Sequence, residues 1–369
     1  MPRFILVGCD VHDRRMVLRI AVDREESVRR DVDNDAESRR RLVEHLRSWA
    51  ARLGAARVVL AYEASGQGFG WHDEVRAAGL ECHVLAPSRI PRSDHQRKRK
   101  NDDKDAGVIL ELLRSHYLAG NALPAVVVPT PQERDDREIT RTRAEVADGV
   151  GRTKTQIHCL LKRNGIRKPT KDLGCWTRGY RAWLAALSEH EGPLPTGARV
   201  ALASLLRRLA LWEEETKRLD HELIALAETP RHKPAVEALT HLPGVGLLVA
   251  LVFLTEIGKP TRFRNRRQVA SYLGLAPASY ESGDSTDRKG HITRQGPPQV
   301  RRVLCQAVWS RVRSDLSENV VYQRLVARNP KRKKIAIVAC MRRLAIRMWH
   351  VALPASSPRA ETAPLAQAV

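Results

Sequence analysis

Short apolar runs separated by polar turns predict alternating strands and helices over the N-terminal third of the chain. Strands are expected at 3–9, 16–22, 28–32, 57–61 and 81–85. Helical patterns follow a capping box at 34–37, lie near 70–79 and run from about 103 to 118. The order β-β-β-α-β-α-β-α predicts a mixed sheet with helices packed against it.

Helical periodicity dominates the rest of the chain. Residues 132–165 are charged and are expected to be helical, whereas 165–197 carry Gly and Pro and are expected to be less regular. Residues 198–228 carry a heptad seam, made of Leu202, Leu205, Leu209, Trp212, Thr216, Leu219, Leu223 and Leu226. This pattern is typical of an ordinary amphipathic helix, a dimerising coiled coil or a helix paired with 132–165. We interpret it as an antiparallel helical arm that supports self-association.

Prolines at 124, 129 and 131 indicate a domain boundary. We therefore expect an α/β domain at 1–123, a linker at 124–131, a helical arm at 132–235 and a mostly α-helical domain at 236–353. Residues 354–369 are rich in Pro, Ala and Ser and predict a disordered tail.

Four carboxylates stand at ends of the predicted elements. Asp10 ends the first strand, Glu63 ends the fourth, and Asp102 and Asp105 begin the helix near 103–118. The element order is that of the RNase H-like fold, and in α/β sheets ligands collect at the carboxyl ends of strands. Converging carboxylates repel one another unless a divalent cation lies between them. Capping explains each acid singly, but the four together predict a Mg²⁺ site, with Mn²⁺ as the alternative.

The residues beside these acids have simpler interpretations. Asp103 points off the face that Asp102 and Asp105 share, so it is expected to be a solvated bystander. His12 and Asp13 are expected to be turn residues and not ligands.

The charge balance of the chain indicates a polyanionic partner. The chain has 369 residues, a net charge of +22 and a pI near 10.4, which is typical of nucleic-acid binding. Its six cysteines are scattered without a C-x-x-C pair, which argues against a zinc site or a disulfide framework. The start of the chain lacks a leader pattern and no apolar run is long enough for a membrane span, so we expect a cytoplasmic protein.

Cationic clusters and one glycine-rich turn are candidate nucleic-acid contacts. The turn Leu242-Pro243-Gly244-Val245-Gly246 resembles a helix-hairpin-helix element, in which glycines let a phosphate approach backbone N–H groups. A tight turn between two helices is an equal alternative, and a solvated face is the alternative for the cations. The candidate residues are Arg97, Lys98, Arg99, Lys100, Gly244, Gly246, Arg262, Arg264, Arg266, Arg267, Arg288, Lys289, Arg294, Arg301 and Arg302.

Residues 272–285 predict a loop that carries several hydroxyl groups among cations. Taken alone, these hydroxyls are best interpreted as turn residues. A serine nucleophile is the alternative, since nearby cations would stabilise the charge that develops when a serine attacks a phosphodiester.

From about Phe4 to Leu353 the chain resembles the IS-one-ten group of bacterial insertion-sequence transposases, also called DEDD transposases. The N-terminal half carries the motifs V-G-C-D (Asp10), Y-E-A-S-G (Glu63) and N-D-D-K-D-A (Asp102, Asp105) of that group's RuvC-like domain. The C-terminal half carries L-P-G-V-G, Y-L-G-L-A-P, Y-E-S-G and R-x-G-P-P-Q-V-R-R. The segment 150–235 matches weakly.

The resemblance implies a DNA transposase or recombinase. It assigns metal binding to Asp10, Glu63, Asp102 and Asp105, and the nucleophile to Ser282, with Ser279 and Ser285 as near alternatives. It further implies a homo-oligomer, dimer or tetramer, in which the serine of one subunit completes the acidic site of another. Element and target DNA would be selected by a guide RNA from the flank of the element.

Two other functions compete with this one. A RuvC-like endonuclease or resolvase would use the same acids with water in place of serine, and it would form no covalent protein–DNA link. A non-catalytic nucleic-acid-binding protein from a decayed element is less consistent with the presence of all four acids and the serine.

Overall fold

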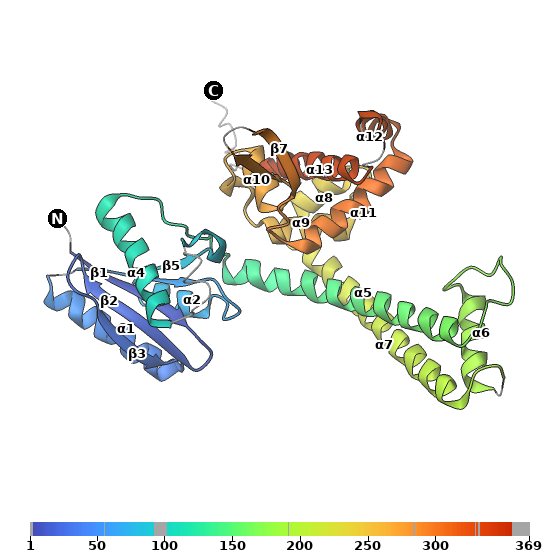
Figure 1. Cartoon of the computed structure of the whole chain (residues 1–369), viewed down its shortest axis with the longest axis horizontal. Coiled ribbons are helices and arrows are strands. Elements are labelled where there is room, and N and C mark those ends of the chain that lie inside the picture. Colours follow the sequence, from blue (N-terminus) through green and yellow to red (C-terminus); the bar gives the residue numbers. More distant parts are fainter. Residues whose placement is uncertain are drawn as a thin grey trace, which may run out of the picture. The chain divides into compact units, whose positions relative to one another are not determined.

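The computed structural model describes residues 3–54, 56–91, 102–190, 192–282, 285–328, 330 and 333–355, with the side chains of 279–289 and 355 outside the description. The chain divides into two compact units, Met1–Val128 and Pro129–Val369 (Figure 1). No helix in the described ranges has both the length and the apolar composition to cross a bilayer.

The first unit contains a five-stranded mixed sheet. Its strands are β1 (Phe4–Val11), β2 (Arg15–Val22), β3 (Val28–Asp33), β4 (Arg57–Glu63) and β5 (Glu81–Leu85). The order across the sheet is β3-β2-β1-β4-β5. The β1–β2 and β2–β3 pairs are antiparallel, whereas β1–β4 and β4–β5 are parallel. The predicted mixed α/β domain is confirmed, and the strand order is consistent with the RNase H-like fold.

Helices cover both faces of this sheet. The side chains of β1 alternate between the two faces and so contribute to two separate cores. Ile5, Val7 and Cys9 belong to the core that includes residues of α1 (Ala36–Arg52) and α2 (Gly70–Ala77). Phe4 and Leu6 belong to the opposite core, beneath α4 (Asp102–Ala119). By the same alternation, Gly8 and Asp10 lie on the α4 face of β1.

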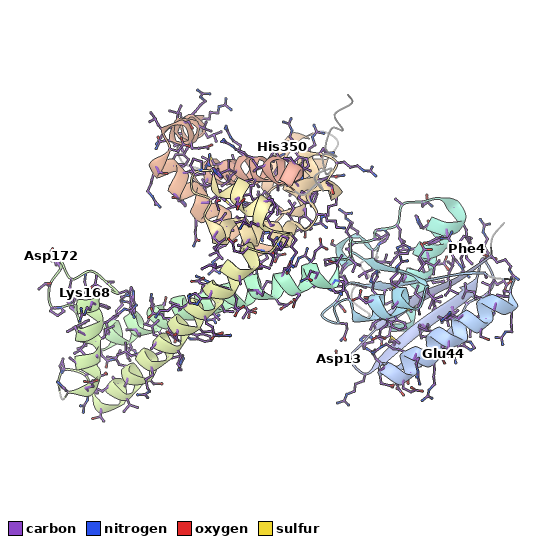
Figure 2. The ribbon with its side chains drawn as sticks, turned by 180° about the vertical axis from the view of Figure 1, so that it is seen from behind. Phe4, Asp13, Glu44, Lys168, Asp172 and His350 are labelled. Carbon is purple, nitrogen blue, oxygen red and sulfur yellow. The ribbon has the colours of Figure 1, made fainter. Side chains whose placement is uncertain are left out.

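A long helical hairpin begins the second unit. Helices α5 (Pro131–Arg163) and α7 (Thr196–Ala227) lie side by side and run in opposite directions, and Figure 2 shows Lys168 and Asp172 at the far end of the hairpin. The predicted seam on α7 therefore packs within the chain, with Leu202, Leu209, Leu219, Leu223 and Leu226 buried. The segment 165–197 is more regular than expected, since it contains α6 (Arg178–Glu189), whose Tyr180 and Leu184 join the hairpin core.

The surroundings of Gly149 explain why a glycine occurs inside α5, where glycine lowers the helix propensity. A Cβ atom at this position would lie 2.8 to 3.2 Å from the ring atoms of Trp212 on α7. The glycine therefore makes room for an indole at the contact between the two long helices.

The remaining helices of the second unit are α8 (Lys233–Thr240), α9 (Leu247–Ile257), α10 (Arg266–Tyr272), α11 (Pro298–Ser314), α12 (Leu316–Arg328) and α13 (Lys333–Ala355). They share one hydrophobic core, and every residue from Ala250 to Ile257 of α9 is buried. The expected loop at 272–285 was wrong in part, because β6 (Pro277–Ser282) and β7 (Ser285–Ile292) form an antiparallel hairpin. The residues of this hairpin are mostly polar, so the sequence lacked the alternation of apolar and polar residues that predicts a strand. Short 3₁₀ turns lie at Pro87–Arg89 and Pro260–Arg262.

Candidate active site

Gly8 sets the closeness of β1 and α4. A Cβ atom on Gly8 would lie 2.5 Å from the backbone nitrogen of Leu110 and still closer to the carbonyl oxygen of Ala106. Both neighbours are backbone atoms of α4, which cannot move aside as a flexible side chain would. The absence of a side chain at Gly8 therefore lets the start of α4 approach the end of β1, where Asp10 lies.

The close packing of β1 and α4 places Asp10 and Asp102 beside the imidazole of His12. The Nε2 atom of His12 lies 3.1 Å from Oδ2 of Asp10 and 3.4 Å from Oδ1 of Asp102. A guanidinium nitrogen of Arg15 lies 3.1 Å from the other oxygen of Asp102. The carboxylates are partly buried, with side-chain exposures of 16% for Asp10 and 27% for Asp102.

A pocket of about 650 Å³ opens beside this cluster. Asp10, Glu63 and Asp105 all line it, so three of the four predicted acids share one cavity and the fourth is joined to it through His12. Glu63 lies beside Asp10 because β1 and β4 are parallel neighbours in which Cys9 pairs with Tyr62, one residue earlier on each strand. The structure therefore brings together the four acids that the sequence singled out.

The loop after β1 supplies the rest of the pocket wall. His12, Asp13, Arg14 and Arg15 all line the cavity, and Figure 2 shows Asp13 at the end of the sheet opposite Phe4. Two arginines beside the acids place positive charge at the rim of an otherwise negative cavity. Such a site can accept a phosphate group next to a carboxylate-bound cation.

The donor set fits a divalent cation. Carboxylate oxygens are the ligands that Mg²⁺ and Mn²⁺ take in proteins, and an imidazole nitrogen is compatible with a transition ion. The neighbouring thiol contributes nothing, because Cys9 belongs to the opposite core and burial raises its pKa. Oxygen donors and one nitrogen therefore form the candidate metal centre.

The structure adds to one expectation about the surroundings and contradicts another. His12 lies in the predicted turn, but its ring contacts both Asp10 and Asp102 and is part of the cluster. Asp103 is no solvated bystander, since its carboxylate accepts hydrogen bonds of 2.6 and 2.5 Å from Arg19 of β2. The Arg19 guanidinium also holds the pKa of Asp103 below its ordinary value. The pair ties the first turn of α4 to the sheet.

The sequence alone missed the importance of Gly8, His12 and Arg19. The one available signal was a glycine inside a buried strand, which often marks a close approach of another backbone. The two side chains gave none, because the α4 residues that they contact, Asp102 for His12 and Asp103 for Arg19, lie more than 80 residues later in the chain.

The glycines of the predicted helix-hairpin-helix turn differ in their surroundings. Gly244 has a φ of +74°, and a Cβ atom there would lie 2.8 Å from the carbonyl oxygen of Ala307 on α11. Arg311 of the same helix is buried and donates to the Pro243 carbonyl oxygen at 2.7 Å. Gly244 therefore serves packing against α11, whereas Gly246 caps α9 with open space around its Cα.

Several of the candidate arginines are engaged within the second unit. Arg262 stacks on the rings of Phe263 and Tyr272, with centroid distances of 4.6 and 4.3 Å. Arg301 donates to the carbonyl oxygen of Gly296 at 2.9 Å, and Arg302 forms an ion pair with Asp148. Arg302 is nevertheless exposed, as are Arg264, Arg266, Arg267 and Arg294.

Some predicted residues lie outside the described set. They are Arg97, Lys98, Arg99 and Lys100, together with the side chains of Ser279, Ser282, Ser285, Arg288 and Lys289. The backbone of Ser282 ends β6 and pairs with that of Ser285 at the start of β7, so the serine precedes the turn of the hairpin.

Two family models match the chain. Residues 7–165 match a DEDD-type model described as "Transposase", and residues 236–323 match "Transposase IS116/IS110/IS902 family". The first range includes the four clustered acids, and the second includes Ser282.

Individual relatives agree with these matches. The chain is 32% identical over 308 residues to "Putative transposase y4rJ" of Sinorhizobium fredii, covering 79% of this chain and 76% of the relative. It is 22% identical over 312 residues to "Transposase for insertion sequence element IS1533" of Leptospira borgpetersenii, covering 84% and 86%. The chain is also 30% identical over 137 residues to "Pilin gene-inverting protein" of Moraxella bovis, a shorter match that covers 36% of this chain and 42% of the relative.

Proposed function

Because the chain belongs to the IS116/IS110/IS902 family of transposases, we propose that it moves a bacterial insertion sequence with a metal-bound acidic site and a serine nucleophile. The observation that carries the first half of this proposal is the convergence of the four acids. Asp10, Glu63 and Asp105 line one pocket, and Asp102 reaches it through His12. Elements as distant in sequence as β1 and α4 contribute to it.

The acids would hold one or two divalent cations, with Mg²⁺ or Mn²⁺ the ions that suit carboxylate ligands. Such ions stabilise the attacking and leaving oxygens of a phosphoryl transfer. Arg14 and Arg15 at the pocket rim orient the DNA phosphate by hydrogen bonds. Gly8 and the Asp103–Arg19 pair keep the carboxylates of α4 within reach of Asp10.

Ser282 is the proposed nucleophile, with Ser279 and Ser285 as the alternatives. Its Oγ attacks a DNA phosphorus, an Oγ–P bond forms and a P–O bond to the adjoining deoxyribose breaks. The serine proton passes to a base and the leaving deoxyribose oxygen takes up a proton. Attack by a deoxyribose hydroxyl of the second strand then reverses these steps and frees the serine.

The serine and the acids belong to different units of the chain, so a homo-oligomer can pair the serine of one copy with the acids of another. The net charge of +22 suits simultaneous binding of DNA and of a guide RNA from the flank of the element. We propose this RNA from the family resemblance.

A covalent adduct tests the function. Protein produced together with the flanking DNA of its element is mixed with Mg²⁺ and element-end DNA, and a complex that survives denaturing detergent is sought. We expect the adduct in the wild type and in Ser279→Ala and Ser285→Ala, but not in Ser282→Ala. Asp10→Asn should abolish both adduct and cleavage while DNA binding persists.

Other outcomes would redirect the assignment. An adduct that Ser282→Ala retains and another serine variant loses moves the nucleophile to that serine. Nicked DNA without any adduct, in reactions that contain the co-purified RNA, favours the RuvC-like endonuclease that uses water. Cleavage that survives Asp10→Asn refutes the metal site.

A further inference from the structure

His12 brings one imidazole nitrogen to two carboxylates. Its Nε2 atom lies 3.1 Å from Asp10 Oδ2 and 3.4 Å from Asp102 Oδ1. One potential ligand atom from each of the three residues lies within 4.8 Å of the other two. The same nitrogen therefore faces both acids.

The two nitrogen–oxygen distances are close to the edge of a coordination octahedron. Two ligands at right angles around an ion at about 2.1 Å are about 3.0 Å apart, and two opposite ligands are about 4.2 Å apart. The distances of 3.1 and 3.4 Å lie near the first value, so the nitrogen is spaced as a neighbour of both oxygens around one ion. A single Nε2–H proton has one strong direction and cannot serve two carboxylates equally well, whereas a shared cation can bind all three atoms.

The backbone of His12 is held in place from two sides. Its N–H donates to the Arg15 carbonyl oxygen at 2.9 Å, which closes the turn between β1 and β2. The side chain of Asn34, just beyond β3, donates to the His12 carbonyl oxygen at 2.7 Å. With 32% of its side chain exposed, the imidazole also lies where water can complete the coordination of an ion.

We propose that His12 is a direct nitrogen ligand of a cation shared with Asp10 and Asp102, and that it favours Mn²⁺ over Mg²⁺ at this site. The inference rests on the proposed function, because it concerns the same metal centre. Mg²⁺ prefers oxygen ligands and keeps its waters, whereas a transition ion accepts an imidazole nitrogen readily. An all-carboxylate site would lack this preference.

Electron paramagnetic resonance of bound Mn²⁺ tests the proposal directly. The full-length protein is loaded with one equivalent of Mn²⁺, and electron spin-echo modulation reports any nitrogen bonded to the metal. We expect a ¹⁴N coupling in the wild type that changes when histidine is labelled with ¹⁵N. His12→Gln keeps an N–H donor but offers the metal only an oxygen, so the coupling should disappear.

His116→Gln is the matched control. His116 lies on α4 about 21 Å along the helix axis from Asp102, and its ring bonds the Asn121 carbonyl oxygen. The ¹⁴N coupling should persist in this variant. Titrations should show that His12→Gln binds Mn²⁺ at least about tenfold more weakly, while the affinity for Mg²⁺ changes by less than about threefold.

The outcomes separate this inference from the proposed function. Bound Mn²⁺ without a ¹⁴N coupling in the wild type, or equal losses for both ions in His12→Gln, would refute His12 as a ligand while the acidic metal site stands. A wild type that binds no Mn²⁺, with the same blank result in Asp10→Asn, would instead overturn the metal site itself. A coupling that His12→Gln retains would assign the nitrogen to another residue.

Discussion

Gly8→Ala adds a single carbon atom, yet we expect it to disturb the acidic site strongly. The new Cβ would lie 2.5 Å from the backbone nitrogen of Leu110, and closer still to the carbonyl oxygen of Ala106. Both atoms belong to the hydrogen-bonded backbone of α4, so the helix as a whole must shift outward from β1. Overpacking of this kind costs about 1–3 kcal/mol, and the backbone contact favours the upper half of that range.

The shift should be visible in both stability and metal binding. A loss of about 2 kcal/mol raises the opening constant of the β1 and α4 amides about thirtyfold, which hydrogen exchange measures peptide by peptide. Moving α4 also moves Asp102 and Asp105 away from Asp10. We therefore expect Mn²⁺ affinity to fall at least about tenfold.

Gly107→Ala is the control on the same helix. A Cβ atom at Gly107 meets nothing within 4 Å, and alanine is favoured over glycine inside a helix by about 1 kcal/mol. The backbone amides of α4 should exchange hydrogen more slowly in this variant than in the wild type, and the variant should bind metal equally well. If Gly8→Ala matched Gly107→Ala in exchange and in metal affinity, the close packing of β1 on α4 would be wrong.

Three further substitutions test contacts that stabilise the fold. Asp103→Asn should lower stability by up to about 1 kcal/mol at pH 7 in urea unfolding, because it breaks the pair with Arg19. Since that pair holds the pKa of Asp103 below the value of about 3.9 expected in the unfolded chain, its contribution is complete above that value and disappears as the pH falls through the folded-state pKa. The variant and the wild type should therefore converge in acid; a constant difference would exclude the ion pair as the cause. In the hairpin, Gly149→Ala should cost about 1–3 kcal/mol by pressing on Trp212, whereas Gly151→Ala, with open space, should be neutral or stabilising by thermal unfolding. Equal effects would contradict the tight contact.

The sequence predicts most of the N-terminal sheet because its strands are short apolar runs with clear breaks. The expected strand at 57–61 and helix at 103–118 correspond to β4 (Arg57–Glu63) and α4 (Asp102–Ala119). Asp10 and Glu63 were expected at strand ends and Asp102 and Asp105 at the start of a helix. This was enough to predict that the four acids meet, because ligands of α/β sheets collect at the carboxyl ends of strands. Local pattern and topology together therefore sufficed for the acids.

Side-chain partners were less predictable, because they depend on register across the sheet. Asp103 was expected to face solvent, yet β2 places Arg19 opposite it. The hairpin β6–β7 was missed for a different reason, since its strands carry mostly polar residues and lack the apolar alternation by which a strand is recognised.

Gly8 and Gly244 show where sequence reasoning about this chain reaches its limit. Gly244, in a turn with a φ of +74°, suggested a phosphate contact, which stays a prediction, and its Cα packs against α11 some 60 residues later. Gly8 suggested nothing beyond a buried strand, yet it fixes how near α4 comes to Asp10. A sequence indicates which backbone conformations a glycine permits. Which neighbour packs so closely that a Cβ atom would not fit is decided by tertiary packing. The glycine whose local pattern was the less informative is therefore the one that packs beside the acidic cluster, and the hydrogen-exchange comparison of Gly8→Ala with Gly107→Ala measures how much this packing stabilises the contact.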